Sequence, residues 1–168
     1  MDQGGRDGHG RPARKQEDAA HVKLFLDTSV LLAAAGSTTG ASRAVIDMGQ
    51  SQHWGLLTSR YCVEELTRNL AKLNAAAPAA WKNHLHPRLT IVRDTLVHNQ
   101  PLLFAKTKDR PILITALAEQ CDVLLTLDQH DFGAFLNRRV YELWIRTPAG
   151  FLEHERDQGQ LTLNDLRL

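Results

Sequence analysis

The sequence predicts an α/β fold in which a mostly parallel sheet is covered by helices on both faces. From residue 21 onward, short apolar segments alternate with segments of helical periodicity. The short segments are continuous apolar runs, which is the pattern of strands buried on both faces. The chain has 168 residues, of which 43% are hydrophobic, so its length suits one domain with a sizeable core.

In chain order, each element is assigned from a local pattern. The expected strands are 22–26, 54–57, 89–93, 123–127 and 140–146. The expected helices are 30–35, 41–50, 59–73, 78–85, 111–120, 132–137 and 149–155. Apolar residues recur at helical spacing in the second helix, Ser59 suits the N-cap of the third, and Pro111 suits the start of the fifth. Residues 94–108 show no clear pattern, and we assign them to a loop that can include a helix.

Residues 1–20 differ in composition from the rest of the chain. They contain four glycines, one proline, and four acidic and four basic side chains whose charges cancel. Such a segment cannot bury enough apolar surface to offset the entropy of ordering, so we expect a disordered or loosely held tail. We assign residues 21–155 to the folded domain and 156–168 to a C-terminal extension.

Composition excludes several classes of protein. No apolar run approaches the roughly 18 residues of a membrane-spanning helix, and the N-terminus lacks a signal-peptide layout. We therefore expect a soluble, cytoplasmic protein with no membrane association. Cys62 and Cys121 fit neither a disulfide framework nor a zinc spacing, and both fall on predicted apolar helix faces, so we expect buried thiols. A net charge of +1 neither indicates nor excludes a nucleic-acid partner.

Two of the expected strands end in a carboxylate. Asp27 follows the first strand, and Asp128 follows the strand at 123–127. Ligands of open parallel sheets bind at the carboxyl ends of the strands. Either aspartate alone also suits a helix N-cap, but two of them on separate strands favour a ligand site.

Further acids are placed to join this site. On the helix at 59–73, Glu65 lies on the flank of the apolar stripe, whereas Glu64 points toward solvent. Asp109 precedes a helix, and Asp131 begins another one three residues after Asp128. For Glu65 and Asp109, an ordinary solvated charge and a favourable contact with a helix dipole are the alternative interpretations.

Carboxylates that converge in a partly buried site repel one another unless a cation neutralises them. Ligand sets made only of oxygen select a hard cation, Mg²⁺ or Mn²⁺, rather than zinc. Such an ion can polarise a phosphate oxygen and lower the pKa of a bound water, which is the chemistry of phosphodiester hydrolysis.

These residues resemble the PIN-domain family over about residues 22–153. The resemblance rests on four segments and on the final strand and helix, namely Phe25 to Leu32, Val63 to Leu70, Asp109 with residues 112–118, Cys121 to Phe132, and residues 145–152. It implies a three-layer α/β/α sandwich with a central, mostly parallel sheet. It also implies a metal-dependent endoribonuclease, the toxin of a toxin–antitoxin pair of the VapC type. RNA, an antitoxin protein and a second copy in a homodimer are then the expected partners.

The resemblance also implies roles for individual residues. The catalytic acids would be Asp27, Glu65, Asp109 and Asp128. The Mg²⁺ or Mn²⁺ ligands would be Asp27, Asp109, Asp128 and Asp131. Thr28 and Thr126 would orient a carboxylate or a bound water. The basic residues near these acids in sequence, which could bind RNA, are Arg43, Arg68, Lys106, Lys108 and Arg110.

Other functions remain as alternatives. The main one is a catalytically silent PIN fold that serves as a binding or regulatory module. A phosphohydrolase with an aspartate nucleophile would need a second aspartate at position 29, where this chain has Ser29. A phospho-receiver domain would place paired acids after its first strand, and nucleotide-binding glycine motifs are absent from the sequence.

Overall fold

The computed structural model describes residues 21–96 and 110–162. A six-stranded sheet in the order β3-β2-β1-β4-β6-β5 forms the centre of the molecule. All neighbouring strands are parallel except β5 and β6, which are antiparallel. The strands are β1 (Lys23–Leu26), β2 (Gly55–Ser59), β3 (Thr90–Val92), β4 (Val123–Leu125), β5 (Arg138–Val140) and β6 (Leu143–Arg146).

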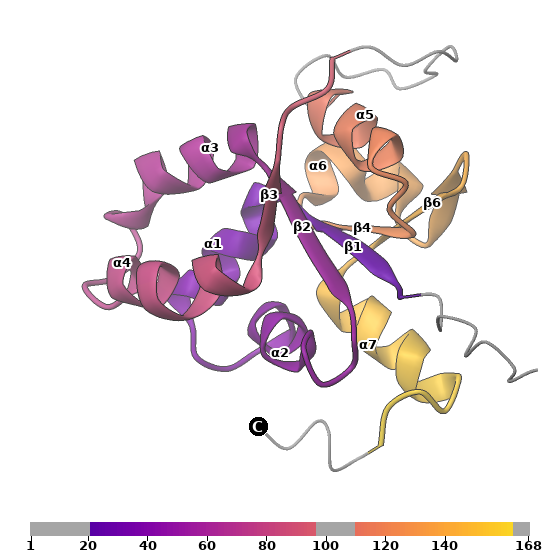
Figure 1. Cartoon of the computed structure of the whole chain (residues 1–168), viewed down its shortest axis with the longest axis horizontal. Helices are drawn as coiled ribbons and strands as arrows, with labels where there is room; N and C mark the ends of the chain where they lie inside the picture. The colour runs from indigo at the N-terminus through magenta and orange to yellow at the C-terminus, as the bar shows by residue number, and fades with distance from the viewer. Residues whose placement is uncertain (1–20, 97–109, 163–168) are drawn as a thin grey trace, which may run out of the picture.

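Helices cover both faces of this sheet (Figure 1). The α-helices are α1 (Thr28–Gly36), α2 (Ala41–Met48), α3 (Arg60–Leu70), α4 (Ala77–Ala80), α5 (Arg110–Ala118), α6 (Gln129–Phe132) and α7 (Pro148–Asp157). A π-helical turn (Trp81–Leu85) and 3₁₀ turns at His86–Arg88 and Gly133–Phe135 complete the set. None of the helices in the two described stretches is both long and apolar enough to cross a lipid bilayer.

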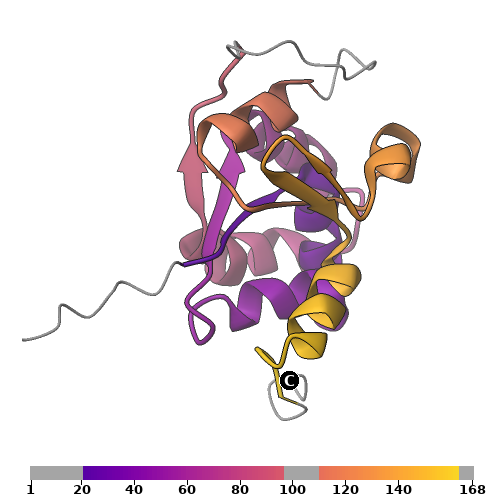
Figure 2. The same ribbon diagram turned by 90° about the vertical axis from the view of Figure 1, so that its right-hand side faces the viewer.

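The alternation of side chains along β1 and β2 assigns the helices to opposite faces. Lys23 Nζ donates to the backbone carbonyl of Glu119 at the end of α5. Leu56, whose partner on β1 is Leu24, lies against Gly49 at the end of α2. Because successive strand residues point to opposite faces, α5 covers one face and α2 the other. Helix α1 packs on α2 and α3, and α7 packs beside α2 (Figure 2).

Strand β1 lies at the centre of the core. Leu24, Phe25 and Leu26 are fully buried between β2 and β4. Burying such side chains contributes about 1.5–3 kcal/mol each, so this one strand anchors both layers. The parallel sheet with helices on both faces confirms the three-layer α/β/α fold expected from the apolar strand runs.

The predicted strand at 140–146 is confirmed for β6 at Leu143–Arg146, but its first residues belong to a hairpin. Val140 on β5 pairs with Leu143 on β6, and Tyr141 turns the chain with φ 55°. Glycine or asparagine usually supplies that left-handed conformation in two-residue turns. A tyrosine at this position gave no turn signal, so the sequence reads as one continuous strand.

Smaller differences occur at element ends. Helix α3 ends at Leu70, and Leu73, which the apolar stripe included, is 41% exposed. Strand β4 ends at Leu125, two residues before the predicted end. Cys62 lies on α3 as expected, but Cys121 follows α5 instead of lying on a helix face; both thiols are buried and free.

The ends of the predicted domain also differ in detail. The predicted helix at 132–137 is an α-turn at Gln129–Phe132 followed by a 3₁₀ turn. Helix α7 continues to Asp157, and Leu161 beyond it is only 4% exposed and belongs to the core. The predicted tail at 1–20 lies outside the described residues.

Candidate active site

Asp27 occupies the junction of β1 and α1. It is 4% exposed and serves as the N-cap of α1. Its Oδ1 accepts a hydrogen bond from the backbone N–H of Thr28 at 2.6 Å. Its Oδ2 accepts from the hydroxyls of Ser29 and Thr126, each at 2.8 Å. Burial raises the pKa of Asp27 above its usual value, and the three hydrogen bonds oppose that shift by favouring the carboxylate.

Thr28 connects Asp27 to the second acid. While its backbone N–H binds Asp27, its hydroxyl donates to Glu65 Oε2 at 2.8 Å. Glu65 lies on α3, which begins with Ser59 as its N-cap, as the sequence indicates. Glu65 is partly buried and its neighbour Glu64 is exposed, which matches the geometry expected from the helical periodicity.

The loop after β4 brings in the third acid. Asp128 is the N-cap of α6, and its Oδ1 accepts from the backbone N–H of Asp131 at 3.0 Å. The backbone N–H of Asp128 donates to the Thr126 hydroxyl at 3.1 Å. Because that same hydroxyl donates to Asp27, Thr126 bridges the first and third acids.

Ser29 makes a second bridge that the sequence analysis did not recognise. Its hydroxyl donates to Asp27 and accepts from the backbone N–H of Leu127 at 2.9 Å. It thereby ties the end of β1 to the loop that carries Asp128. Its position two residues after a strand-terminal aspartate was the available signal, since a hydroxyl there can reach back to the carboxylate.

A cavity of about 160 Å³ lies where these elements meet. Three of the four predicted catalytic acids, Asp27, Glu65 and Asp128, line it. The other lining residues are Thr28, Ser29, Leu32, Tyr61 and Ile112. The structure therefore brings together carboxylates from β1, α3 and the β4–α6 loop, which are far apart in sequence.

This set of donors fits a hard divalent cation. Three carboxylates around one small cavity repel one another strongly unless positive charge is present. The cavity contains neither thiols nor imidazoles among its described lining residues, and oxygen ligands suit Mg²⁺ or Mn²⁺. Asp27, Glu65 and Asp128 are the residues that could hold such an ion.

A comparison with protein families agrees with this geometry. The model described as "PIN domain" matches residues 23–130, which is more than half of the chain. The chain belongs to the PIN-domain family. A search of curated proteins found no match. Among solved structures, the chain is similar to VapC20 of Mycobacterium tuberculosis, whose structure is described as that of a sarcin–ricin loop cleaving toxin. The two share 18% identity with a TM-score of 0.43, over 66% of this chain and 93% of that one.

In this PIN domain, Asp131 lies beside the cavity and does not line it. Its side chain is buried, and its Oδ1 lies 2.7 Å from His130 Nδ1. One potential ligand atom from each of Asp128, His130 and Asp131 lies within 4.8 Å of the others. Asp131 is thus placed to support Asp128 or to contribute to an ion next to it. Asp109, the remaining predicted acid, lies outside the described residues.

The predicted RNA-binding residues of the PIN domain separate into groups. Arg43 Nε pairs with Asp47 on α2 at 2.9 Å, and Arg88 also pairs with Asp47. Because α2 leads into the amino end of β2, this ion-pair group is remote from the strand ends that carry the acids. Arg68 is exposed on α3, three residues after Glu65. Lys106 and Lys108 lie outside the described residues, as does the side chain of Arg110.

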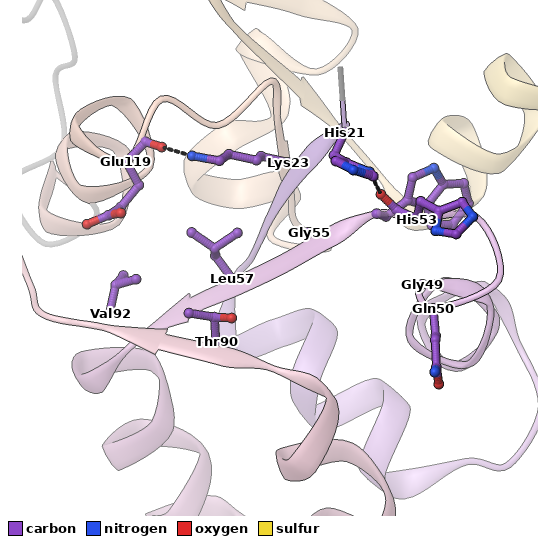
Figure 3. Close-up of a pocket in the computed structure, with 11 residues that line it drawn as sticks. His21, Lys23, Gly49, Gln50, His53, Gly55, Leu57, Thr90, Val92 and Glu119 are labelled. Carbon is purple, nitrogen blue, oxygen red and sulfur yellow. Dashed lines mark hydrogen bonds between the residues drawn. The ribbon is translucent and has the colours of Figure 1, made fainter. Parts of the chain in front are cut away.

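A larger cavity of about 580 Å³ lies elsewhere in the PIN domain (Figure 3). It is lined by the first residues of β1 and β2, Lys23 and Gly55, and by residues of the 49–54 segment before β2, so it lies toward the amino ends of these two strands. Of the side chains that line it in the described part of the chain, Glu119 alone is a carboxylate. Figure 3 shows Lys23 reaching to the backbone carbonyl of that residue. The smaller cavity is therefore the candidate active site.

Proposed function

We propose that this PIN domain is a metal-dependent endoribonuclease that hydrolyses RNA phosphodiester bonds with Mg²⁺ or Mn²⁺. Nucleases are the general rule in this family. The observation that carries the proposal is the convergence of Asp27, Glu65 and Asp128 on one small cavity. Structural needs alone do not explain three carboxylates at one point, since their mutual repulsion costs stability.

In the proposed mechanism, Asp27, Asp109 and Asp128 would hold the ion, and Asp131 would support them. The bound ion would supply Lewis acidity toward a phosphate oxygen and charge stabilisation during hydrolysis. Glu65 would orient the attacking water or hold a second ion. The carboxylate of Asp27 is held in place by three donors, so it needs little reorganisation when substrate binds.

The hydroxyls of Thr28 and Thr126 are positioning groups in this proposal. Each donates to one acid, Glu65 or Asp27, and so fixes the rotamer of that carboxylate. Arg68 lies on the same helix as Glu65 and is proposed to contact the RNA backbone, together with Lys106, Lys108 and Arg110. The ion pair of Arg43 with Asp47 does not support a similar role for Arg43.

We further propose a role as the toxin of a toxin–antitoxin pair, with an antitoxin protein and a homodimer as partners. This part rests on the resemblance of the Asp-Thr-Ser and Thr-Leu-Asp segments to the PIN-domain family, many of whose members are toxins of the VapC type. The alternative is a catalytically silent PIN fold that binds a partner without turnover. The presence of the acids in one cavity favours the enzyme.

The deciding experiment is cleavage of a labelled, structured RNA by the purified protein with Mg²⁺ or Mn²⁺. EDTA should abolish cleavage, and Asp27→Asn should reduce it by at least about a hundredfold. Glu65→Gln and Glu64→Gln form a matched pair on adjacent positions of α3, of which only the first should lose activity. Equal activity of both variants, or cleavage that resists EDTA, would contradict the proposal.

A further inference from the structure

Part of the wall of the candidate active site is apolar. Leu32, Tyr61 and Ile112 line the cavity together with the carboxylates. Ile112 is 3% exposed, whereas Leu32 and Tyr61 are only partly buried. Of these three side chains, Leu32 and Tyr61 are therefore the ones that a ligand arriving from solvent can also touch.

The size of the cavity limits what can enter it. A water molecule occupies roughly 30 Å³ in the liquid, so a cavity of about 160 Å³ holds about five of them. A phosphate group with a cation fits in that space, but a nucleoside has several times as many non-hydrogen atoms. If the phosphate lies at the acids, the attached base and ribose lie at or beyond the mouth of the cavity, where Leu32 and Tyr61 are accessible.

Tyr61 is held in place at this wall. It lies four residues before Glu65 on α3, so the two side chains project from the same face of the helix. The backbone N–H of Tyr61 donates to both carboxylate oxygens of Asp94, at 3.2 and 3.1 Å. The backbone N–H of the next residue, Cys62, donates to the Ser59 hydroxyl. Asp94, which follows β3, therefore fixes the first turn of α3 together with Ser59.

We infer that Tyr61 contacts the base of the nucleotide whose phosphate lies among the acids, and that Asp94 is its positioning residue. This inference rests on the proposed function, since it places an RNA phosphate in the carboxylate cavity. An aromatic ring stacks on any base, but a base inside a duplex already stacks and pairs with its neighbours. The substrate class is therefore RNA with an unpaired nucleotide at this position.

The test compares binding of a short single-stranded RNA with binding of a ribose–phosphate chain of the same length that lacks bases. Fluorescence anisotropy in Ca²⁺, another hard cation with oxygen ligands, gives the affinity of wild type and Tyr61→Ala for each probe, with a gel to check that the probes stay intact. Base stacking predicts that the wild type prefers the base-bearing probe by roughly tenfold or more, and that Tyr61→Ala brings this preference to about twofold or less. Tyr141→Ala removes the other of the two tyrosines in the chain, at the β5–β6 turn, and should keep the wild-type preference.

Further variants separate contact from a purely structural role. Tyr61→Phe keeps the ring and should keep the preference, whereas Asp94→Asn should weaken it while the Mn²⁺ affinity remains within about threefold of wild type. Loss of Mn²⁺ binding in Tyr61→Ala would show that the residue only supports the fold of the site, and would overturn the inference. An unchanged base preference in Tyr61→Ala would also overturn the inference, as would a wild-type protein that binds neither probe.

The cleavage assay distinguishes this inference from the proposed function. A wild type that binds RNA through Tyr61 but never cleaves it would reject the nuclease and retain the base contact. A wild type that cleaves RNA, with no effect of Tyr61→Ala on affinity or base preference, would retain the nuclease and reject the base contact.

Discussion

The hydroxyl of Thr28 donates to Glu65 Oε2 at 2.8 Å and joins the first turn of α1 to the second turn of α3. Thr28 is 5% exposed, so water does not readily replace this bond. The contact joins elements on either side of β2 in sequence. Because the backbone N–H of Thr28 also binds Asp27, it fixes Glu65 relative to Asp27.

Replacing Thr28 with valine should separate these acids without removing either one. Valine keeps the side-chain shape and the backbone N–H that binds Asp27, but it cannot donate to Glu65. We expect a loss of about 10- to 100-fold in Mn²⁺ affinity or RNA cleavage. Isothermal titration calorimetry and cleavage rates provide the measurements. Thr67→Val, on the exposed face of α3, is the matched control and should leave both unchanged.

Ser29→Ala should weaken both the fold and the activity. The variant loses the donor to Asp27 and the acceptor for the backbone N–H of Leu127. We expect the free energy of unfolding to fall by about 1–2 kcal/mol, measured by urea denaturation in EDTA. Ser37→Ala removes a hydroxyl from an exposed loop and serves as the comparison. A Ser29→Ala protein as stable as wild type would contradict the bridging role.

Divalent metal should stabilise the folded protein. A ligand that binds only the native state adds about 2.7 kcal/mol at a hundred times its dissociation constant. We therefore expect Mn²⁺ to raise Tm in differential scanning fluorimetry and EDTA to reverse the shift. The shift should largely disappear in Asp128→Asn and persist in Asp157→Asn, where the carboxylate is exposed on α7 and pairs with Arg156. Equal shifts in the two variants would place the metal elsewhere.

Arg68 and Arg43 should differ in their contribution to RNA binding. Each phosphate contact adds about one unit to the slope of log affinity against log salt concentration. Arg68→Gln should lower that slope by about one unit, since Arg68 is exposed beside Glu65. Arg43→Gln should leave the slope unchanged because Arg43 is engaged with Asp47. A salt titration of RNA affinity measures both, and the reverse result would restore the role predicted for Arg43.

Stability should fall at alkaline pH because of the buried thiols. Burial raises the pKa of Cys121 to about 12 from its usual value of 9.0, and it also raises the pKa of Cys62. A raised pKa in the folded state contributes stability that is complete below the unfolded value and is lost as pH rises from 9 toward 12. Each pH unit in that window costs about 1.4 kcal/mol for one thiol.

Chemical denaturation at a series of pH values between 8 and 11 measures this effect. Cys121→Ala should show a flatter decline than wild type in this range. The thiols of native wild-type protein should also react slowly with iodoacetamide near neutral pH, since the thiolate is the reactive form. Fast alkylation of the folded protein would show that the thiols are accessible.

The fold can be predicted from the sequence because many short patterns indicate its elements independently of one another. Apolar runs such as Leu24–Leu26 identify buried strands, and Ser59 and Pro111 identify helix starts. The hairpin at Tyr141 was missed because its turn residue lacks the usual chemistry. A strained conformation at a single residue depends on the packing around it, which a local pattern does not report.

The acids of the candidate site can be predicted from the sequence, but the hydrogen bonds that link distant residues around them are harder to predict. Asp27 and Asp128 are found because the carboxyl ends of parallel strands meet at one edge. The link from Ser29 to Leu127 joins residues 98 positions apart, and the capping of Tyr61 by Asp94 joins residues 33 apart. Arg43 lies near Asp27 in sequence, yet its helix leads to the opposite end of the strands. These long-range contacts and positions depend on the order of the strands in the sheet, which short sequence patterns do not indicate.

The central position of β1 between β2 and β4 has a consequence during protein synthesis. Asp27 leaves the ribosome about a hundred residues before Asp128. Its Oδ2 can accept the hydrogen bond from the Thr126 hydroxyl only after that later segment has been synthesised. An incomplete chain that ends before β4 exposes one side of β1 and lacks the third carboxylate. For the nuclease proposed here, the nascent chain is therefore inert toward nearby RNA until nearly the whole domain has been translated.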